Sequence, residues 1–231
     1  MRLPIGRKRA AVFALPICRQ ELLLVGAAHE LRTPLTVARG HLELLQRERD
    51  CPALEVALDE LDRLARIVAR MLLIAELETE PPVRGRIELA SLLTDAAAAR
   101  PRVQLATASR GAVAGDKATL LLALEELIAN SLDRSFTDEP IVLASRESED
   151  GVIISVTDHG PGVDEQCADN LFDCFARVER DRGRSSGGAG LGLAIVRAVV
   201  RAHHGRCGVR HRRSRPGAIW WLWLPVGDDN A

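Results

Sequence analysis

The N-terminal third of the chain carries apolar residues at helical spacing. From Leu24 to Leu45 the steps between apolar residues alternate between four and three, which is a heptad pattern. An Asp-Cys-Pro segment at positions 50–52 interrupts this pattern, and a second seam with extra flanking apolar residues follows. The two seams are Leu24, Ala28, Leu31, Leu35, Ala38, Leu42 and Leu45, and then Leu54, Ala57, Leu61, Leu64, Val68, Met71 and Ala75. The pattern predicts a helical hairpin over residues 21–80.

A single hairpin of this kind buries too little apolar surface to be stable by itself. Two copies packed side by side would bury both seams in a four-helix bundle, so we expect a homodimer. Pro81 and Pro82 end the helical part, and residues 81–85 are expected to form a linker. Residues 1–20 precede the hairpin as an N-terminal extension.

A different pattern follows over residues 86–227, where short apolar runs alternate with helical stretches. The expected strands are Ile87–Ala90, Val103–Thr107, Ile141–Ser145, Val152–Thr157 and Ala218–Pro225. The expected helices are Leu92–Ala99, Thr119–Leu132 and Leu193–His203. We predict an α/β sandwich with one mixed sheet covered by helices on one face, which makes the chain α+β overall. Residues 228–231 form a tail.

Composition excludes several classes of protein. The 231 residues are 47% hydrophobic and 27% charged, which is typical of globular and not of disordered chains. Lys and Arg number 31 against 32 Asp and Glu, and this balance argues against a protein that coats nucleic acid. The basic cluster Arg206–Arg215 lacks interleaved aromatic residues, so we interpret it as a charged hairpin loop and expect no nucleic-acid partner.

Cysteine usage and hydropathy bear on the cellular compartment. Five Cys residues without any C-x-x-C pair give neither a zinc site nor a disulfide framework, which suits a reducing compartment. The best candidate for a transmembrane segment, Ala10–Cys18, is far shorter than the roughly 20 apolar residues that a spanning helix needs. We expect a cytoplasmic protein; membrane association through a partner or a missing N-terminal part is the alternative.

The segment His29-Glu30-Leu-Arg-Thr-Pro-Leu is the first candidate for chemistry. A neutral imidazole is nucleophilic at one nitrogen when a carboxylate holds the proton on the other, and Glu30 is a candidate for that carboxylate. Pro34 removes a backbone hydrogen bond and is expected to kink the helix just after His29. For a lone histidine, an ordinary surface position is the alternative interpretation.

Three further clusters follow in the second part of the chain. An apolar strand ends in Asp158, which could accept a hydrogen bond from an exocyclic amine such as that of adenine, although a simple turn is the alternative. A glycine-rich run at 187–192 leads into a helix whose N-terminal N–H groups could receive phosphate, with a glycine hinge as the alternative. Glu126 and Asn130 are four apart and share a helix face, where the Asn130 amide oxygen could ligate Mg²⁺.

Taken together, these motifs resemble the sensor histidine kinases of two-component signalling. In that family's terms the segments are similar to the H-box at 29–35, the N-box at 126–135, the G1 box at 158–162, the F-box at 171–177 and the G2 box at 188–193. The resemblance extends from about Glu21 to Val226 and implies a hairpin for dimerisation and phosphotransfer, followed by a domain that binds ATP with Mg²⁺.

The resemblance also implies roles for single residues. His29 would be the phosphoacceptor, Glu30 its base, and Thr33 would orient water during dephosphorylation of the partner. Asn130 would bind Mg²⁺ and Asp158 would hold adenine. The remaining residues expected to contact nucleotide are Arg134, Gly160, Gly162, Arg177, Gly188, Gly190, Leu191 and Gly192. Residues 164–187 would be a lid over ATP, in which some of Arg177, Arg180, Arg182 and Arg184 neutralise charge on the γ-phosphate.

The N-box departs from the family's usual pattern. Glu126 stands where Asn is common, and Asp133 and Arg134 replace a basic residue followed by an aromatic one. A glutamate at this place also resembles the related gyrase, heat-shock chaperone and mismatch-repair ATPases, in which it activates water. Because the chain has no tyrosine, the Arg134 guanidinium could stack on adenine in place of the aromatic ring.

We therefore expect an ATP-dependent, autophosphorylating protein-histidine kinase that passes its phosphoryl group from His29 to an aspartate of a response-regulator receiver domain. The alternatives are a degenerate kinase acting as a dimeric scaffold and an ATP hydrolase using Glu126. The hairpin and sandwich leave no room for a separate sensor domain, so the input is expected to arrive through a partner, or residues 1–20 are the remnant of a longer protein.

Overall fold

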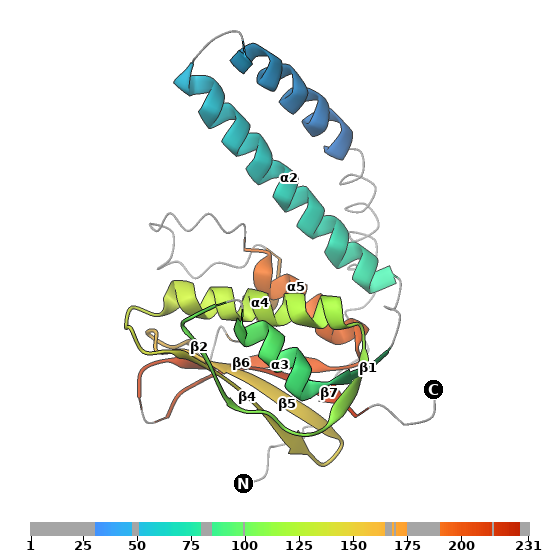
Figure 1. Ribbon diagram of the computed structural model, residues 1–231, viewed down its shortest axis with the longest axis vertical. Helices are drawn as coiled ribbons and strands as arrows, with labels where there is room; N and C mark the ends of the chain where they lie inside the picture. The colour runs from blue at the N-terminus through green and yellow to red at the C-terminus, as the bar shows by residue number, and fades with distance from the viewer. Residues whose placement is uncertain are drawn as a thin grey trace. The chain divides into compact units, whose positions relative to one another are not determined.

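A computed structural model of the chain describes residues 31–47, 51–79, 85–98, 100–164, 168, 170–174, 190–213 and 215–226. The chain divides into two compact units, Met1–Glu76 and Leu77–Ala231. Figure 1 labels most of the helices and strands described below. Within the described residues, no helix has the length and apolar character needed to span a membrane.

The first unit contains two helices, as the heptad pattern predicts. Residues 31–47 are helical, and α2 (Pro52–Thr79) begins with a proline, whose missing N–H costs nothing in the first turn of a helix. Leu35 of the first helix packs against Val68 and Leu72 of α2. Leu35 and Val68 come from the two predicted seams and Leu72 flanks the second, so the packing confirms the helical part of the prediction; residues 21–30 lie outside the described part.

Large apolar side chains on this hairpin nevertheless remain exposed to solvent. Among the described residues of the first unit they are Leu31, Val37, Leu44, Leu45, Val56 and Leu64. An ion pair between Arg39 and Asp62 at 2.8 Å also joins the two helices, but exposed pairs of this kind contribute little to stability. One hairpin therefore leaves much of its apolar surface uncovered.

The second unit is built on a five-stranded mixed sheet with the order β2-β4-β5-β7-β6. Its strands are β2 (Val103–Thr107), β4 (Ile141–Ser148), β5 (Gly151–Thr157), β7 (Ala218–Pro225) and β6 (Arg206–His211). Only β2 and β4 run parallel, and the other neighbours are antiparallel. A separate two-stranded sheet pairs β1 (Gly85–Glu88) with β3 (Ala112–Gly115).

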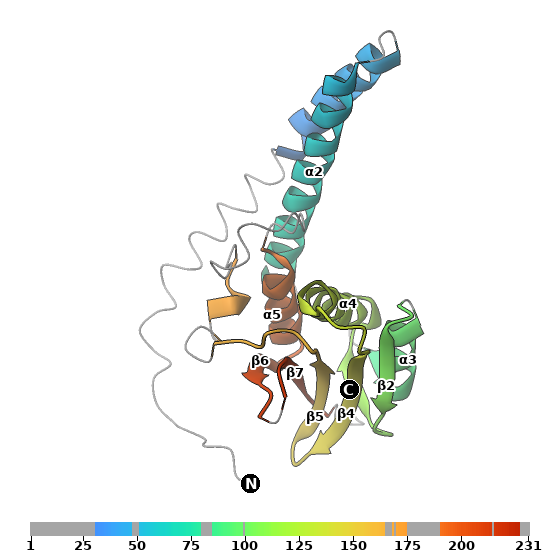
Figure 2. The same cartoon turned by 90° about the vertical axis from the view of Figure 1, so that its left-hand side faces the viewer.

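Three helices cover one face of the large sheet, α3 (Leu89–Ala98), α4 (Lys117–Arg134) and α5 (Gly192–Ala202), as Figure 2 shows. Side chains alternate along the strands, so every second residue of β7, including Trp220 and Leu222, is buried beneath the helices. The opposite face carries the partly exposed Trp223, whose indole N–H donates to the Ser148 hydroxyl at 3.1 Å. The predicted mixed sheet with helices on one face is confirmed.

Two sequence-based assignments are wrong. The cluster Arg206–Arg215 does not form only a charged loop, because its first part is the edge strand β6, in which Arg206 and Arg210 are exposed while Val209 is half-buried. Charged side chains on an edge strand discourage pairing with other chains, and they also mask the alternating pattern. The run at 87–90 is a strand only to Glu88, since its last two residues begin α3.

Candidate functional site

The start of α4 is held by a side-chain cap and by a histidine of α5. Oδ2 of Asp116 accepts a hydrogen bond from the Thr119 N–H at 3.0 Å. Burial acts to raise the pKa of Asp116, but N–H groups of Thr119 and Ala118, together with the nearby His203, lower it below its ordinary value. Nε2 of the buried His203 accepts the Asp116 N–H at 3.0 Å, so its Nδ1 carries the proton and donates to the Val199 carbonyl at 2.7 Å. These contacts set α4 against α5.

Glu126 of α4 lies directly against the first residue of α5. A β-carbon on Gly192 would lie 2.5 Å from Oε2 of Glu126, so only glycine fits there without a shift. The preceding residue, Leu191, is fully buried, and its side chain makes no capping hydrogen bond to α5. A carboxylate thus lies beside a helix N-terminus whose own N-cap side chain, among the described residues, leaves the first N–H groups uncapped.

Asn130 lies one helical turn after Glu126, on the same face of α4. Its amide nitrogen is buried without a hydrogen-bond partner within the described part of the chain. Because rotating an amide by 180° exchanges its nitrogen and oxygen with little steric change, this group can present either atom to a ligand. The unpaired amide and the Glu126 carboxylate together offer the oxygen ligands that Mg²⁺ prefers.

Asp158, the residue that follows β5, is 1% exposed and accepts three hydrogen bonds. Its Oδ1 accepts the backbone N–H groups of Gly160 at 3.0 Å and Ala218 at 2.9 Å. Its Oδ2 accepts the indole N–H of Trp220 at 2.8 Å. The carboxylate is therefore held as an acceptor in one orientation, as recognition of an amine requires.

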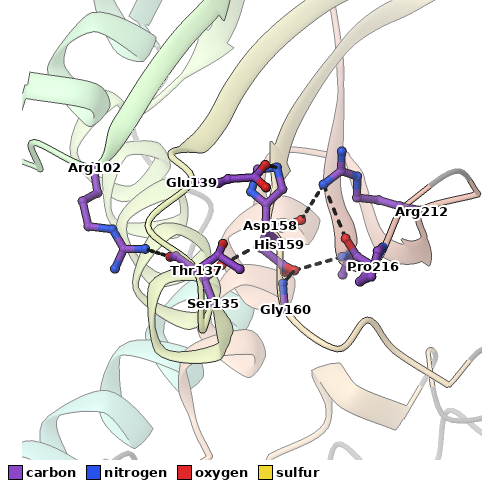
Figure 3. Close-up of polar contacts among 10 residues, drawn as sticks. Arg102, Ser135, Thr137, Glu139, Asp158, His159, Gly160, Arg212 and Pro216 are labelled. Atoms are coloured by element: carbon purple, nitrogen blue, oxygen red, sulfur yellow. Dashed lines mark hydrogen bonds and ion pairs between the residues drawn. The ribbon is translucent and has the colours of Figure 1, made fainter.

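The C-terminal end of α4 meets the turn after Asp158 (Figure 3). The Ser135 hydroxyl at this end accepts the His159 N–H at 3.2 Å, and a β-carbon on Gly160 would lie 2.5 Å from the Arg134 carbonyl oxygen. Nε2 of His159, whose side chain is 10% exposed, pairs with Glu139 at 3.0 Å. The predicted nucleotide contacts Arg134 and Gly160 are thus neighbours.

The connection between β6 and β7 closes over the same turn. Gly162 has φ of 83°, and a β-carbon there would collide with the His211 ring. Arg212 donates to the Asp158 carbonyl at 3.2 Å, as Figure 3 shows, and Gly217 adopts φ of 131° where a β-carbon would meet that same carbonyl. The glycines expected in this turn are required by close approach of neighbouring backbone and side chains.

The described residues include most of the predicted nucleotide contacts, all of them in the second unit, together with the candidate catalytic residue Glu126. These contacts are Asn130, Arg134, Asp158, Gly160, Gly162, Gly190, Leu191 and Gly192. Gly190, with φ of 72°, turns the chain into α5. Thr33 is exposed on the helix of the first unit, while His29, Glu30, Arg177 and Gly188 lie outside the described residues.

Sequence patterns do not identify Trp220 and Ser135 as part of the site. The alternation along β7 does indicate that Trp220 is buried with its neighbours Ala218 and Leu222, and a buried indole N–H requires an acceptor. That requirement is the signal that could have linked Trp220 to a nearby carboxylate. Ser135 gives no comparable signal, because a serine after a helix is common.

Two family models match the chain. The first, described as His Kinase A (phospho-acceptor) domain, matches residues 19–80. The second, described as Histidine kinase-, DNA gyrase B-, and HSP90-like ATPase, matches residues 115–228. Each of the five segments singled out above falls within one of these two matched ranges.

Named relatives agree with these matches. The chain is 37% identical over 194 residues to the probable sensor histidine kinase TcrY of Mycobacterium tuberculosis, covering 78% of this chain and 40% of that protein. It is 34% identical over 199 residues to the phosphate regulon sensor protein PhoR of Pseudomonas aeruginosa, covering 79% and 45%. The chain thus spans less than half the length of these curated relatives.

A solved structure is similar to the chain over most of its length. It is that of full-length ShkA in complex with AMPPNP, with a TM-score of 0.72 and 26% identity, covering 91% of this chain and 47% of that one. The mycobacterial sensor histidine kinase MprB, at 23% identity and a TM-score of 0.53, shares the fold over 62% of this chain.

Proposed function

Because the chain belongs to the sensor histidine kinases of two-component systems, we propose that it is an ATP-dependent, autophosphorylating protein-histidine kinase. The observation that carries this proposal is that α4, which bears Asn130, contacts the first residue of α5 through Glu126 and the turn after Asp158 through Arg134, all within one unit. An acceptor for a base, an unpaired amide and a helix N-terminus are the three elements that a nucleoside triphosphate with a cation needs.

In this proposal the buried Asp158 carboxylate accepts the exocyclic amine of adenine. Arg134 lies next to the turn that holds Asp158, where its guanidinium can stack on the base. Gly190, Leu191 and Gly192 direct backbone N–H groups and the positive end of α5 toward the phosphates. Arg177 and Gly188 would add contacts from the loop between these segments.

Asn130 and Glu126 would hold Mg²⁺ against the phosphates, where the cation neutralises charge that develops on the transferring group. No cluster of three or more His, Cys, Asp or Glu side chains suited to a metal occurs among the described residues. The two oxygen donors of Asn130 and Glu126 fit a cation that completes its coordination with phosphate oxygens and water, as Mg²⁺ does.

The chemical step is phosphoryl transfer to an imidazole. A ring nitrogen of His29 would form a bond to the γ-phosphorus while the bond from that phosphorus to the β–γ bridging oxygen breaks, and ADP leaves with the electron pair. Glu30 would hold the proton on the other ring nitrogen. A receiver-domain aspartate would then take the phosphoryl group as the phosphorus–nitrogen bond breaks. Thr33 would orient water for the separate dephosphorylating activity, in which water hydrolyses the phosphoaspartate to aspartate and phosphate.

We further propose that the protein is a homodimer whose hairpins form a four-helix bundle. The exposed apolar residues of the hairpin support this, since Leu31, Leu45 and Leu64 belong to the heptad seams yet are 50%, 48% and 41% exposed in a single chain. Since ATP and receiver domains are found in the cytoplasm, both units would work in that compartment.

Labelling with γ-labelled ATP and Mg²⁺ tests the kinase proposal directly. We expect an acid-labile, base-stable label on the protein that is lost in His29→Ala and kept in His41→Ala, which removes an exposed histidine of the same hairpin. Asn130→Ala should abolish labelling, and added receiver domain should remove label from the kinase. Label that survives in His29→Ala contradicts the proposal.

A further inference from the structure

Within the part of the chain that the structure describes, the hydrogen bonds of Asp158 leave one acceptor position open on its carboxylate. A carboxylate offers about four acceptor positions, two on each oxygen. Both positions of Oδ1 are used by the backbone N–H groups of Gly160 and Ala218. On Oδ2 the Trp220 indole N–H uses one position, so the remaining one lies on the oxygen that Trp220 contacts.

We propose that Trp220 is a positioning residue that sets the base preference of the site by orienting Asp158. This inference rests on the proposed nucleotide binding and adds to it the residue that makes the site prefer a 6-amino purine over a 6-oxo purine. An indole N–H can only donate, so a carboxylate oxygen bonded to it is kept as an acceptor. The open position then accepts a hydrogen bond from the amine of adenine, whereas the carbonyl oxygen of guanine has no hydrogen to donate and is repelled by the carboxylate.

The surroundings of Trp220 keep its indole N–H in place. The side chain is fully buried on β7, an interior strand of the sheet. Phe172 contacts its ring edge-to-face, with centroids 6.1 Å apart and planes at 69°. Asp158 itself is buried, and Arg212 donates to its carbonyl, so neither partner of the hydrogen bond can turn toward solvent without repacking the turn.

Backbone N–H groups alone would not give the same preference. Both backbone donors, from Gly160 and Ala218, contact Oδ1, and the alanine side chain has no hydroxyl that could donate to Oδ2 in place of the indole. If the indole N–H is removed, two positions on Oδ2 become open and a water molecule can occupy one of them. That water donates one hydrogen to Oδ2 and can donate the other to a carbonyl on the base, so the distinction between an amine and a carbonyl weakens.

Trp220→Phe tests this, because it removes the N–H and keeps an aromatic ring beside Phe172. The matched control is Trp223→Phe, which removes an indole N–H that donates to Ser148 on the other sheet face. Calorimetry would compare binding of AMPPNP and GMPPNP, the non-hydrolysable analogues of ATP and GTP. We expect Trp220→Phe to bind AMPPNP about three- to tenfold more weakly and to lose a similar factor of preference for AMPPNP over GMPPNP. The control should match the parent.

Indole resonances provide a second readout that does not depend on a folded Trp220 variant. The chain has only three tryptophans, so ¹⁵N-labelled protein gives three indole N–H signals, which the Trp221→Phe and Trp223→Phe variants assign. The Trp220 signal should shift on adding AMPPNP and in Asp158→Asn, and the Trp223 signal should shift in neither case. A Trp220 signal unmoved by both changes overturns the inference.

Failure of this inference can be told apart from failure of the kinase proposal. If His29 is labelled but Trp220→Phe keeps the parental affinity and preference, or loses them no more than Trp223→Phe does, the inference is wrong and the kinase proposal stands. If Trp220 sets the preference but no label appears on His29, the inference stands and the kinase proposal is wrong. A parent protein that binds neither analogue overturns both.

Discussion

Oε2 of Glu126 lies where a β-carbon on Gly192 would be only 2.5 Å away, so a carboxylate of α4 touches the first residue of α5. This contact brings an acidic group to the helix end that is proposed to bind phosphate. Any residue larger than glycine at the first position of α5 would require the Glu126 side chain to move.

Gly192→Ala should therefore disturb the phosphate end of the site. A methyl group there requires the Glu126 carboxylate, the far end of a flexible side chain, to move, at a cost of about 0.5–1.5 kcal/mol in the free energy of unfolding. We expect weaker AMPPNP binding by calorimetry and a lower Tm. Adding Glu126→Ala should recover part of the lost stability, because the double variant removes the clash.

Gly40→Ala is the control for this substitution. Gly40 lies in the helix of residues 31–47, and nothing lies within 4 Å of a β-carbon placed there. Alanine should stabilise that helix by about 0.5–1 kcal/mol and leave nucleotide binding unchanged. A Gly192→Ala protein with parental Tm and affinity contradicts the clash.

The N-cap of α4 should contribute stability that is lost in acid. The folded pKa of Asp116 is below the ordinary value of 3.8, so its contribution is fully present above about that pH and disappears as the pH falls through the lower folded value. Asp116→Ala should cost about 1 kcal/mol at pH 7, measured by urea unfolding. Asp116→Asn retains a capping side chain and should remove only this part of the acid dependence.

Exposed Asp138 offers a comparison for the acid experiment. Asp138→Asn should leave the stability within about 0.5 kcal/mol of the parent, as is usual for surface positions. The interval from pH 5 to pH 3 brackets the ordinary carboxyl pKa of about 4. If Asp116→Asn and the parent lose the same amount of unfolding free energy over this interval, the cap does not act as described.

The proposed dimer predicts that a charge in the heptad seam separates the subunits. Leu45→Glu places a carboxylate at an apolar position that is 48% exposed in one chain and would be buried between two. Sedimentation should show monomers at concentrations where the parent is dimeric. Arg47→Glu, two residues later on the same helix and also exposed, should remain dimeric. Equal behaviour of the two variants would contradict the bundle.

Two cysteines of the second unit should differ strongly in reactivity. Burial raises the pKa of the Cys207 thiol to about 11, although Arg197 and Arg201 act in the opposite direction. At pH 8 only about one thiol in a thousand is then ionised, and the thiolate is the reactive form. Iodoacetamide followed by mass spectrometry should modify the exposed Cys174 at least about tenfold faster than Cys207. Denaturant should abolish this difference in modification rate, because it removes the burial of Cys207. A difference that persists in denaturant would contradict the assignment of slow modification to burial.

Much of the fold could be predicted because it depends on local pattern. β2 (Val103–Thr107) and β7 (Ala218–Pro225) have the predicted bounds, since each is a short apolar run between turn residues. The sequence does not predict β3 (Ala112–Gly115), because its four residues are too short and too uniformly apolar to show an alternation of polar and apolar positions. It is a strand because β1 pairs with it. β6 was hidden by the arginines of an edge strand.

The sequence by itself determined the two-unit plan and most of the residues that form the candidate site. Helical periods, turn glycines and the Glu126–Asn130 spacing are properties of neighbouring residues, so they can be recognised without knowing the fold. The tertiary structure alone decided what surrounds them. Ala218 and Trp220 lie 60 and 62 residues from Asp158, and they reach its carboxylate only because β5 and β7 pair with Thr157 opposite Ile219. No local pattern encodes that register, because it depends on how the whole sheet packs beneath its helices.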